Sequence, residues 1–352
     1  MDPVTRIETF SQIRSDRIQR KSFLKIDTEG PYTYFLSPNR RAVSLFAERI
    51  NNPELSRKFL TVVLRSSRLI PQVLQYAPGV QTVEISVPAN ESFEFGIVSP
   101  RLLTLLAPKA GSVSKIGWEN DERLRPELDI RQRLPESINT PQILEIDKKF
   151  PYFVTQYVEG RSLENPVENW DHLLNALCQL EDWYNSSETT WVSREAAIEE
   201  LENELSGLKN DEVIKTSLER LRESSLPEQL SRGTVHGDLH DDNILVSDDT
   251  VYIIDWEGTK NEYLLYDFLY PFLRFRRRNG RSEIFDQLMN ERADGGRIGR
   301  AYADRCGSTV WGSSDWFPQL VLFGLLRETA RRPRTETKWK TAYECLQELR
   351  MD

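Results

Sequence analysis

Histidine, cysteine and methionine are scarce in this chain of 352 residues, each occurring three times. The cysteines, Cys178, Cys306 and Cys345, are odd in number and far apart, so they predict neither a disulfide framework nor a zinc site. Cys178 lies in a helical apolar run, and we expect it in a core. Positive charge is in deficit, because the net charge is −9 at pH 7. This balance argues against general nucleic-acid binding and mildly favours cationic substrates.

Long hydrophobic runs are missing too. No apolar stretch is long enough to span a bilayer, and Asp2, Arg6 and Glu8 interrupt any amino-terminal signal peptide. We therefore expect a cytoplasmic protein that does not bind membranes. The chain is 39% hydrophobic, which suffices for ordinary cores, and its length suggests two or three domains.

Two of the three histidines stand in one stretch, residues 236–243, which reads His-Gly-Asp-Leu-His-Asp-Asp-Asn. An apolar run follows at 244–246, and a second apolar run at 251–254 ends in Asp255. The pattern predicts a loop, a strand, a hairpin turn at 247–250 and a second strand. Asp and Asn are common in ordinary turns, but here the His-Gly start, both strands and the later Asp coincide.

These residue types suit phosphoryl transfer. That reaction needs the γ-phosphate, metal ions and the attacking hydroxyl to be held in line, with little covalent help from the protein. Mg²⁺ takes oxygen ligands and usually only one or two carboxylates, which suits Asn243 and Asp255. Asp238 suits the role of the base, or of the group that orients the hydroxyl. Buried strands on either side would give these side chains a rigid support.

The stretch 236–246 resembles the His-Gly-Asp-x-His-x-x-Asn-Ile-Leu motif of the aminoglycoside phosphotransferase and choline kinase family, and residues 254–257 resemble its Ile-Asp-Trp/Phe-Glu motif. The resemblance runs from about Gly111 to about Phe268. It implies an α+β, kinase-like bilobal fold with a small β-rich N-lobe and a mostly helical C-lobe. It also implies ATP or GTP and Mg²⁺ as cofactors, and a small-molecule acceptor.

Residue by residue, the resemblance implies that Asp238 is the catalytic base, that Asn243 and Asp255 bind metal, and that His236 and His240 support the loop. Two departures separate the chain from protein kinases. Gly237 stands where regulated protein kinases carry Arg, and Trp-Glu replaces Phe-Gly after the metal Asp, with no Ala-Pro-Glu following. Both favour a small-molecule acceptor over a protein.

A nucleotide site of this kind also needs a strand Lys for the phosphates and a helix Glu to hold that Lys. Residues 111–118 alternate like a strand, and Lys115 is the candidate. Residues 121–134 follow as a helix. Glu127 is preferred as the partner because its spacing to a later Leu resembles the family's, with Glu122 as the alternative. A solvated strand Lys and a solvated helix Glu would give the same pattern.

Residues 152–160 form an aromatic and β-branched strand that ends in Gly. In the resembled fold this strand leads to the hinge that binds adenine, so Gln156 to Val158 is the hinge candidate, although a plain core strand would look the same. No Gly-x-Gly-x-x-Gly precedes the strand Lys. Residues 93–98 and 102–106 could instead be the first two strands, joined by a turn in which Ser99 or Arg101 reaches a phosphate. A surface turn without that role is favoured.

Residues 1–90 have no obvious place in a kinase core. They hold an amphipathic stretch, an aromatic run at 32–36 and two helix-like stretches at 42–50 and 55–64. We expect an extra α/β segment packed on the N-lobe (residues 91–158), or else a separate module that binds a protein partner. The C-lobe, residues 159–352, carries the catalytic and metal loops.

The C-lobe is expected to be mostly helical, with helices at 173–183, 194–208, 263–275 and 320–329. Asp267 resembles the family's Asp that holds local backbone, and its role is expected to be structural. The basic run at 274–281 fits a solvated helix end capped by Gly280, or else a patch for an anionic substrate or partner. Four acidic groups near the motif fit a solvated surface better than a site for a cationic acceptor: Asp241, Asp242, Glu257 and Glu262.

The sequence therefore predicts an ATP- and Mg²⁺-dependent phosphotransferase acting on a hydroxyl of a small molecule, such as a sugar, an amino alcohol or an aminoglycoside. The missing glycine-rich loop and the unassigned amino-terminal segment suggest a rival, a catalytically weak pseudokinase that serves as a nucleotide-binding or scaffold module. A protein kinase is a second rival, which Gly237 opposes.

Overall fold

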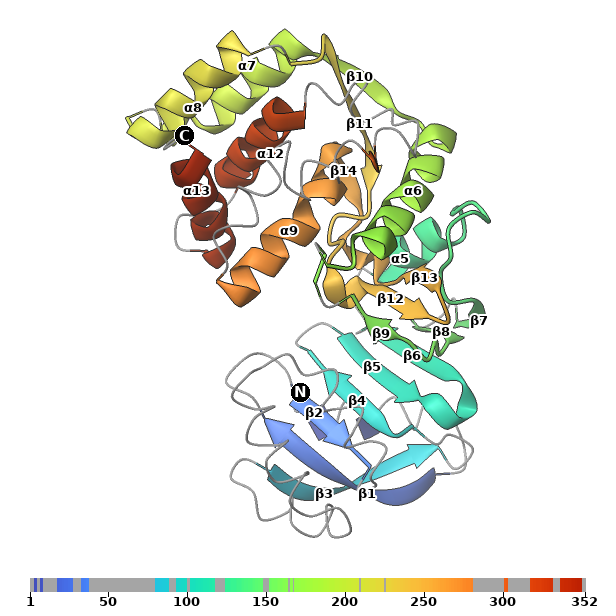
Figure 1. Cartoon of the computed structure of the whole chain (residues 1–352). Coiled ribbons are helices and arrows are strands. Elements are labelled where there is room, and N and C mark those ends of the chain that lie inside the picture. The colour runs from blue at the N-terminus through green and yellow to red at the C-terminus, as the bar shows by residue number, and fades with distance from the viewer. Residues whose placement is uncertain are drawn as a thin grey trace. The chain divides into compact units, whose positions relative to one another are not determined.

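A computed structural model gives the structure of the chain (Figure 1). It describes residues 3–4, 7–8, 18–27, 33–37, 80–88, 93–99, 102–117, 124–147, 152–163, 165–166, 168–208, 210–224, 226–280, 301–302, 317–331 and 336–349. The expected helix-like stretches at 42–50 and 55–64 and the alternative residues Glu122 and Arg101 lie outside this set.

The chain forms two compact units, each of which is described by itself. The sheet unit comprises Met1–Arg125 and Pro141–Glu159, and the helical unit comprises Pro126–Thr140 and Gly160–Asp352. A β-rich amino-terminal part and a largely helical carboxy-terminal part confirm the predicted α+β class.

The sheet unit contains one antiparallel sheet of eight strands in the order β3-β1-β2-β4-β5-β6-β8-β7. Its strands are β1 (Ile18–Asp27), β2 (Thr33–Leu36), β3 (Val80–Pro88), β4 (Phe95–Val98), β5 (Leu102–Ala107), β6 (Ser112–Gly117), β7 (Ile143–Asp147) and β8 (Tyr152–Gln156). A short 3₁₀ turn, η1 (Pro108–Ala110), joins β5 to β6. The strands of residues 1–90 thus pair directly with those of the expected N-lobe, through β2 and β4.

Both faces of this sheet are covered, because neighbouring residues on one strand belong to different apolar clusters. Phe23 and Phe35 pack on one face, whereas the next residues along, Leu24 and Leu36, pack on the other. Successive side chains of a strand point to opposite faces, so burial on both sides needs continuous apolar runs. That explains the near-continuous apolar runs of β2, β4 and β5.

The strands expected at 93–98, 102–106, 111–118 and 152–160 are confirmed as β4, β5, β6 and β8. The stretches 93–98 and 102–106 pair with each other as β4 and β5, and β1, β2 and β3 come before them in the same sheet. The strand expected to reach Gly160 ends at Gln156.

The helical unit is built on helices α6 (Trp170–Ser186), α7 (Arg194–Glu204), α8 (Glu212–Glu223), α9 (Leu265–Asn279), α12 (Phe317–Arg331) and α13 (Thr337–Leu349). Two small antiparallel sheets complete it, with orders β10-β11-β14 and β13-β12-β9. Their strands are β9 (Arg161–Ser162), β10 (Thr190–Ser193), β11 (Gln229–Val235), β12 (Ile244–Ser247), β13 (Thr250–Ile253) and β14 (Lys260–Tyr263). One apolar cluster joins the helices to these sheets.

Helix ends in this unit follow local chemistry. Ser193 caps α7 and Asp211 caps α8, each by accepting hydrogen bonds from backbone N–H groups of the first turn. Gly280 ends α9 in a left-handed conformation with φ of 63°, which confirms the expected cap. The helix expected at 121–134 is α5 (Leu124–Arg131) and ends before the expected Leu134.

The cysteines correct one expectation. Cys178 packs against the core as expected, but it is disulfide-bonded, whereas Cys345 is free and buried. Among the helices that the structure describes, none is both long and apolar enough to cross a membrane.

Candidate functional site

The motif predicted from the sequence forms a loop that enters from β11 and leaves through the β12–β13 hairpin. Asp248 and Asp249 close the hairpin with positive φ values of 45° and 65°, between the paired residues Ser247 and Thr250. The predicted turn is confirmed. At the open end of the hairpin, the backbone N–H of Ile254 donates to the carbonyl of Asn243 at 3.0 Å. Pairing therefore brings the two predicted metal-binding segments side by side.

Asp267, on α9, fixes the start of the loop. Its carboxylate accepts the backbone N–H groups of His236 at 2.6 Å and Gly237 at 2.9 Å. It also accepts the hydroxyl of Tyr184 at 2.7 Å. The expected structural role of Asp267 agrees with these contacts.

His236 is fully buried and supports the loop through hydrogen bonds of its ring. Its Nδ1 accepts the backbone N–H of Asp238 at 3.3 Å, and its Nε2 lies 2.9 Å from the carbonyl of Ile254. An accepting Nδ1 leaves the ring proton on Nε2, which donates to that carbonyl. The ring also packs on Trp256, with centroids 4.7 Å apart. One imidazole thus ties the loop to the segment that carries Asp255.

A close backbone approach joins the same two segments. Gly237 has φ of 79°, and a Cβ there would lie 2.1 Å from the carbonyl oxygen of Gly258. Gly258 ends the 3₁₀ turn η4 (Trp256–Gly258), and a Cβ on it would lie 2.9 Å from the Cβ of Asp238. Sequence reasoning missed Gly258. Its only signal was a Gly three residues after the expected metal-binding Asp.

Asp238 and His240 face one another in the loop, with 3.5 Å between Oδ2 and Nε2. Burial opposes the charge on Asp238, but hydrogen bonds from His240 and Tyr270 outweigh it and lower the pKa of the carboxyl to about 2. Burial likewise opposes the charge on His240, but Asp238 and Asp241 raise the pKa of the ring to about 9. At neutral pH the pair is therefore a carboxylate beside an imidazolium.

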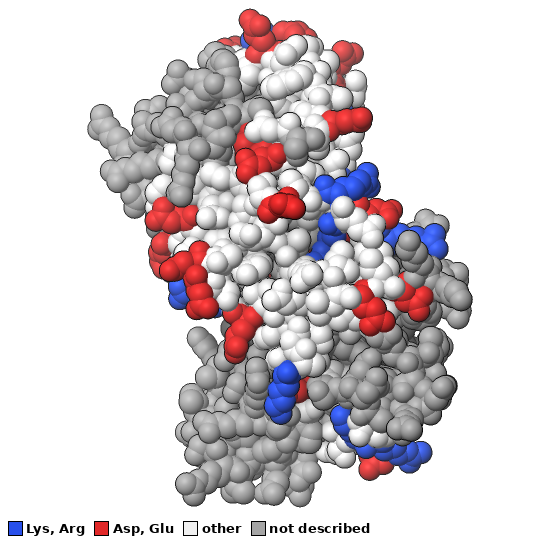
Figure 2. All heavy atoms as spheres, turned by 90° about the vertical axis from the view of Figure 1, so that its right-hand side faces the viewer, with Lys and Arg blue, Asp and Glu red and all other residues white. Residues whose placement is uncertain are grey.

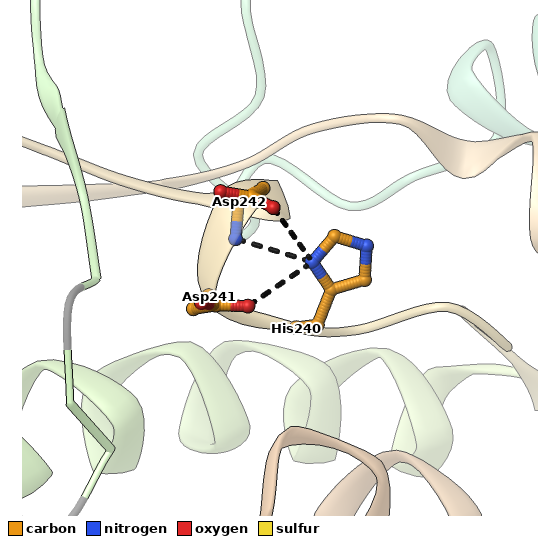
Figure 3. Close-up of side chains that lie close together, drawn as sticks. All are labelled: His240, Asp241 and Asp242. Carbon is orange, nitrogen blue, oxygen red and sulfur yellow. Dashed lines mark hydrogen bonds and ion pairs between the residues drawn. The ribbon is translucent and has the colours of Figure 1, made fainter. Parts of the chain in front are cut away.

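Figure 3 shows how His240, Asp241 and Asp242 lie together. Nδ1 of His240 is 3.4 Å from Asp241 Oδ1 and 3.1 Å from the backbone nitrogen of Asp242. A ring nitrogen cannot both donate and accept, so the protonated ring donates to Asp241, and the Asp242 contact is a hydrogen bond only in the neutral ring. Arg278 pairs with Asp241, which is buried, and lies 3.4 Å from Asp242.

Asn243 is buried and directed by a hydrogen bond from its Nδ2 to the carbonyl of Asp238 at 2.9 Å. That bond leaves its amide oxygen as the group that can bind a cation. Asp255 has a left-handed backbone with φ of 66°, and one oxygen each of Asp255, Glu127 and Glu257 lie within 4.8 Å of one another. Glu257 is exposed, whereas Glu127 is fully buried.

Glu127 was predicted as the partner of Lys115, and the structure places it in the helical unit beside Asp255. The guanidinium of Arg131, one turn later on α5, interacts electrostatically with Glu127 and Asp255. Burial lowers the pKa of Arg131, and these two carboxylates oppose that effect. Arg131 is thus a cation beside the carboxylate cluster.

The other predicted nucleotide-binding residues lie in the sheet unit. Lys115 is on β6, paired with Thr104 of β5 and Phe153 of β8. Gln156 ends β8, and its backbone N–H donates to the carbonyl of Gln142 at 2.8 Å. Val158, two residues on, is buried.

Ser99 closes the turn between β4 and β5. Its hydroxyl accepts the backbone N–H of Leu102 at 2.8 Å and lies 3.0 Å from the carbonyl of the same residue. These contacts agree with the favoured reading of a plain turn, and a role in phosphate binding stays a prediction.

Two residues near Asp238 were missed by sequence reasoning. Tyr270, on α9, hydrogen-bonds to the Asp238 side chain, and burial and the charge of Asp238 raise its pKa. Lys338, on α13, donates to the Tyr270 hydroxyl at 2.6 Å. Neither could be found from the sequence, because 32 and 100 positions separate them from Asp238 and no motif connects them.

Two of the four acidic groups near the motif differ from the solvated surface that was expected. Asp241 is buried and paired, and Glu262 is 1% exposed, with ion pairs to Arg327 at 3.0 Å and to Arg331. The solvated reading was wrong for these two. Glu257 is exposed and Asp242 partly so, in agreement with it.

Comparison with known proteins places this geometry in a family. The model of the phosphotransferase enzyme family matches residues 112–302, and no curated protein matches the chain. The chain resembles the GDP complex of an aminoglycoside 2'-phosphotransferase-IIIa mutant at 16% identity and TM-score 0.48, covering 72% of this chain and 89% of that one. It resembles a choline/ethanolamine kinase family protein from Mesorhizobium loti at 15% identity and TM-score 0.41, covering 80% and 93%.

A third similar structure is the choline kinase LicA from Streptococcus pneumoniae, at 14% identity and TM-score 0.44, covering 70% of this chain and 90% of that one. The family match spans more than half of the chain, including both predicted motifs. The kinase-like fold expected from the motifs is that of the family. This chain belongs to the phosphotransferase enzyme family.

Proposed function

We propose that the protein transfers the γ-phosphoryl group of ATP or GTP to a hydroxyl of a small molecule, with Mg²⁺ as cofactor. The observation that carries this proposal is that hydrogen bonds hold the two motifs, residues 236–246 and 254–257, side by side. The amide of Asn243 is held on the carbonyl of Asp238, and the backbone beside Asp255 is held on that of Asn243. The loop before the β12–β13 hairpin and the segment after it thus hold a candidate base and two candidate metal ligands together.

The residues present fit a magnesium ion. The amide oxygen of Asn243 and the carboxylate of Asp255 are hard oxygen donors of the kind that Mg²⁺ prefers, with phosphate oxygens and water completing its shell. Glu127 and Glu257 add carboxylates beside Asp255, and such a concentration of negative charge favours a cation. When bound, the metal neutralises charge on the transferred phosphoryl group.

Asp238 acts on the acceptor in this proposal. Its pKa of about 2 keeps it ionised at neutral pH, so it accepts a hydrogen bond from the acceptor hydroxyl and aims the oxygen at phosphorus. A carboxylate with so low a pKa is a weak base, so the proton reaches it late, as the new O–P bond forms and the bond to the departing nucleotide breaks. His236 and His240 position Asp238. Lys115 binds phosphates, and Gln156 to Val158 bind adenine.

The experiment compares wild type, Asp238→Asn and Asp249→Asn. Each is tested for Mg-ATP-dependent thermal stabilisation and for turnover on sugars, amino alcohols, aminoglycosides and nucleosides. Bound Mg-ATP at a hundred times its Kd should stabilise all three by about 2.7 kcal/mol. Asp238→Asn should lower turnover by about 10²–10⁴-fold. Asp249 is exposed in the hairpin turn, and Asn tolerates its left-handed backbone, so Asp249→Asn should keep full turnover.

Unchanged turnover in Asp238→Asn would reject the assignment of Asp238. One observation favours the rival function of a pseudokinase: the hydroxyl of Ser99, in the turn where a glycine-rich loop would stand, is engaged within that turn. Stabilisation by Mg-ATP without turnover on any acceptor would support that rival.

A further inference from the structure

The basic run at the end of α9 divides into two kinds of arginine. The side chain of Arg276 is 6% exposed and pairs with Glu348 of α13 through the two terminal nitrogens of its guanidinium group. Arg278 is 18% exposed and pairs with Asp241 in the candidate catalytic loop. The expectation of a solvated helix end was wrong for these two residues, which tie α9 to α13 and to the loop.

Arg274 and Arg277 have no such partner. Neither forms an ion pair with a carboxylate within the part of the chain that the structure describes. Burial and the neighbouring charge of Arg274 lower the pKa of Arg277, and the charge of Asp238 only partly opposes them. Arg274 interacts electrostatically with Asp241, but its Nε is buried without a hydrogen-bond partner among the described residues. Two partly buried cations that repel each other are stabilised by an anion that binds both.

These arginines lie beside the candidate catalytic Asp. Arg277 hydrogen-bonds to Tyr270, which hydrogen-bonds to Asp238. On the same hydroxyl, Lys338 donates at 2.6 Å. The charge of Lys338 acts on Asp238 and that of Asp238 on Arg277, so cationic groups lie close to the carboxylate that would orient the acceptor hydroxyl.

Tyr270, which lies beside Asp238, and the tyrosine stacked on it already face cations of the protein itself. Tyr266 and Tyr270 stack with ring centroids 5.3 Å apart. Nζ of Lys260 lies 3.7 Å from the centroid of the Tyr266 ring, and Nζ of Lys338 lies 5.0 Å from that of Tyr270. A ring face attracts a ligand cation only where it is not already used in this way. A quaternary or primary ammonium acceptor would therefore meet repulsion here.

The negative net charge of the chain is compatible with repulsion of a cationic acceptor beside Asp238. On the face drawn in Figure 2, acidic side chains occur in several separate places with basic side chains between them. The acidic side chains behind the net charge of −9 therefore form no single patch on that face. The choice of acceptor then depends on the charged groups beside Asp238.

We propose that the acceptor is an anionic alcohol, whose carboxylate or phosphate group binds to Arg274 and Arg277 while its hydroxyl meets Asp238. The anionic group lies within a few bonds of the reacting hydroxyl, since the two binding sites are so close. The inference rests on the proposed phosphoryl transfer and names the class of acceptor. It argues against aminoglycosides and choline-like amines, which carry positive charge.

The experiment uses inorganic phosphate and acetate as separate probes on the full chain, without nucleotide, at constant ionic strength set with NaCl. Affinity is measured by calorimetry for wild type, for Arg274→Gln with Arg277→Gln, and for Arg222→Gln. Arg222 of α8 serves as the matched control. It is exposed and pairs with Glu202 of α7 at 2.7 Å. Loss of one charge-assisted hydrogen bond corresponds to about tenfold in affinity. The double variant should therefore bind the preferred anion at least about tenfold more weakly, and Arg222→Gln should bind as wild type does.

A wild-type measurement keeps the inference testable if the double variant fails to fold. The preferred anion should raise the midpoint of thermal unfolding, and tetramethylammonium at the same ionic strength should not. Equal anion affinity in wild type and double variant, or stabilisation by tetramethylammonium alone, would overturn the inference. Phosphate binding without acetate binding would identify a phosphorylated acceptor, and the reverse a carboxylic acid.

Stabilisation by Mg-ATP, measured in parallel, separates the two proposals. If Mg-ATP stabilises the protein and no anion binds through the arginines, the acceptor class is wrong and phosphoryl transfer stands. If an anion binds through the arginines but Mg-ATP has no effect, the anion site stands and the phosphotransferase proposal fails.

Discussion

At the scale of single residues, the site depends on an absence of side chains as much as on the chemical groups it contains. Gly237 and Gly258 face one another so closely that a Cβ on the first would lie 2.1 Å from the carbonyl oxygen of the second. A Cβ on Gly258 would lie 2.9 Å from the Cβ of Asp238 and 3.2 Å from its backbone nitrogen. These neighbours are backbone and Cβ atoms, which cannot rotate away. The candidate base is therefore held by contact with a neighbouring turn.

Gly258→Ala should consequently displace Asp238 and lower turnover. We expect at least about a 10²-fold loss in kcat/KM, because a shift of about 1 Å in a reacting group costs that much, and a loss of about 1–3 kcal/mol in the free energy of unfolding from overpacking. Gly207→Ala is the matched control, since a Cβ there would meet no atom within 4 Å. Steady-state kinetics and denaturant unfolding of the two variants check this. A fully active Gly258→Ala would show that the loop moves freely.

At the scale of elements, the sequence predicts a segment well where its local chemistry and its tertiary role agree. The β12–β13 hairpin has apolar strands around an Asp-Asp turn, and both its strands and its turn were predictable. β9 and β14 were not predicted. β9 is two residues long and is defined by its pairing with β12, and the polar residues of β14 become a strand only through pairing with β11. Such pairing depends on contacts that no local pattern records.

An ion-pair network joins four elements of the helical unit. Arg327 of α12 binds Glu200 of α7 at 2.7 Å and Glu262 of β14 at 3.0 Å, and Arg232 of β11 binds Glu200 at 2.6 Å. Burial opposes the charge on Glu200, but hydrogen bonds from Arg327 and Arg232 outweigh it and lower its pKa from 4.5 to about 2. The folded state therefore binds a proton on Glu200 less readily than the unfolded state.

The stabilisation from Glu200 should accordingly be complete above pH 4.5 and should decline as the pH falls from 4.5 toward 2. Urea unfolding of wild type and Glu200→Gln between pH 7 and pH 3 measures it, and the difference in unfolding free energy should shrink on acidification. Glu199→Gln is the control, because Glu199 is the next residue of the same helix and is exposed. A constant difference for Glu200→Gln across this range would contradict the argument.

At the scale of the whole molecule, the fold class was predictable from the sequence, whereas the extent of the sheet was not. Asp238, Asn243 and Asp255 could be proposed as site residues because the chemistry they suit requires a fixed spacing. Residues 1–90 were read as a segment added to the N-lobe, or as a partner-binding module, because they match no motif. Their strands β1, β2 and β3 hydrogen-bond into one sheet with β4 to β8. Strand order is set by long-range pairing, which a single sequence does not reveal.

If these strands belong to the core of the sheet unit, a buried charge on the outermost of them should destabilise the protein. Ile85 of β3 is fully buried in the apolar cluster that includes Phe23 and Ile116. Ile85→Asp should lower the free energy of unfolding by at least about 3 kcal/mol, because an unpaired carboxylate would lose its hydration.

Thr82→Asp places the same side chain at an exposed position of the same strand, and its cost should stay below about 1 kcal/mol. Thermal unfolding of both variants, with binding of Mg-ATP as a second readout, tests whether the effect extends beyond β3. If Ile85→Asp unfolds as wild type does, the amino-terminal strands add nothing to stability, and a separate partner-binding role for residues 1–90 gains support. If Ile85→Asp lowers both the midpoint of thermal unfolding and the affinity for Mg-ATP, the amino-terminal strands stabilise the part of the sheet that carries Lys115.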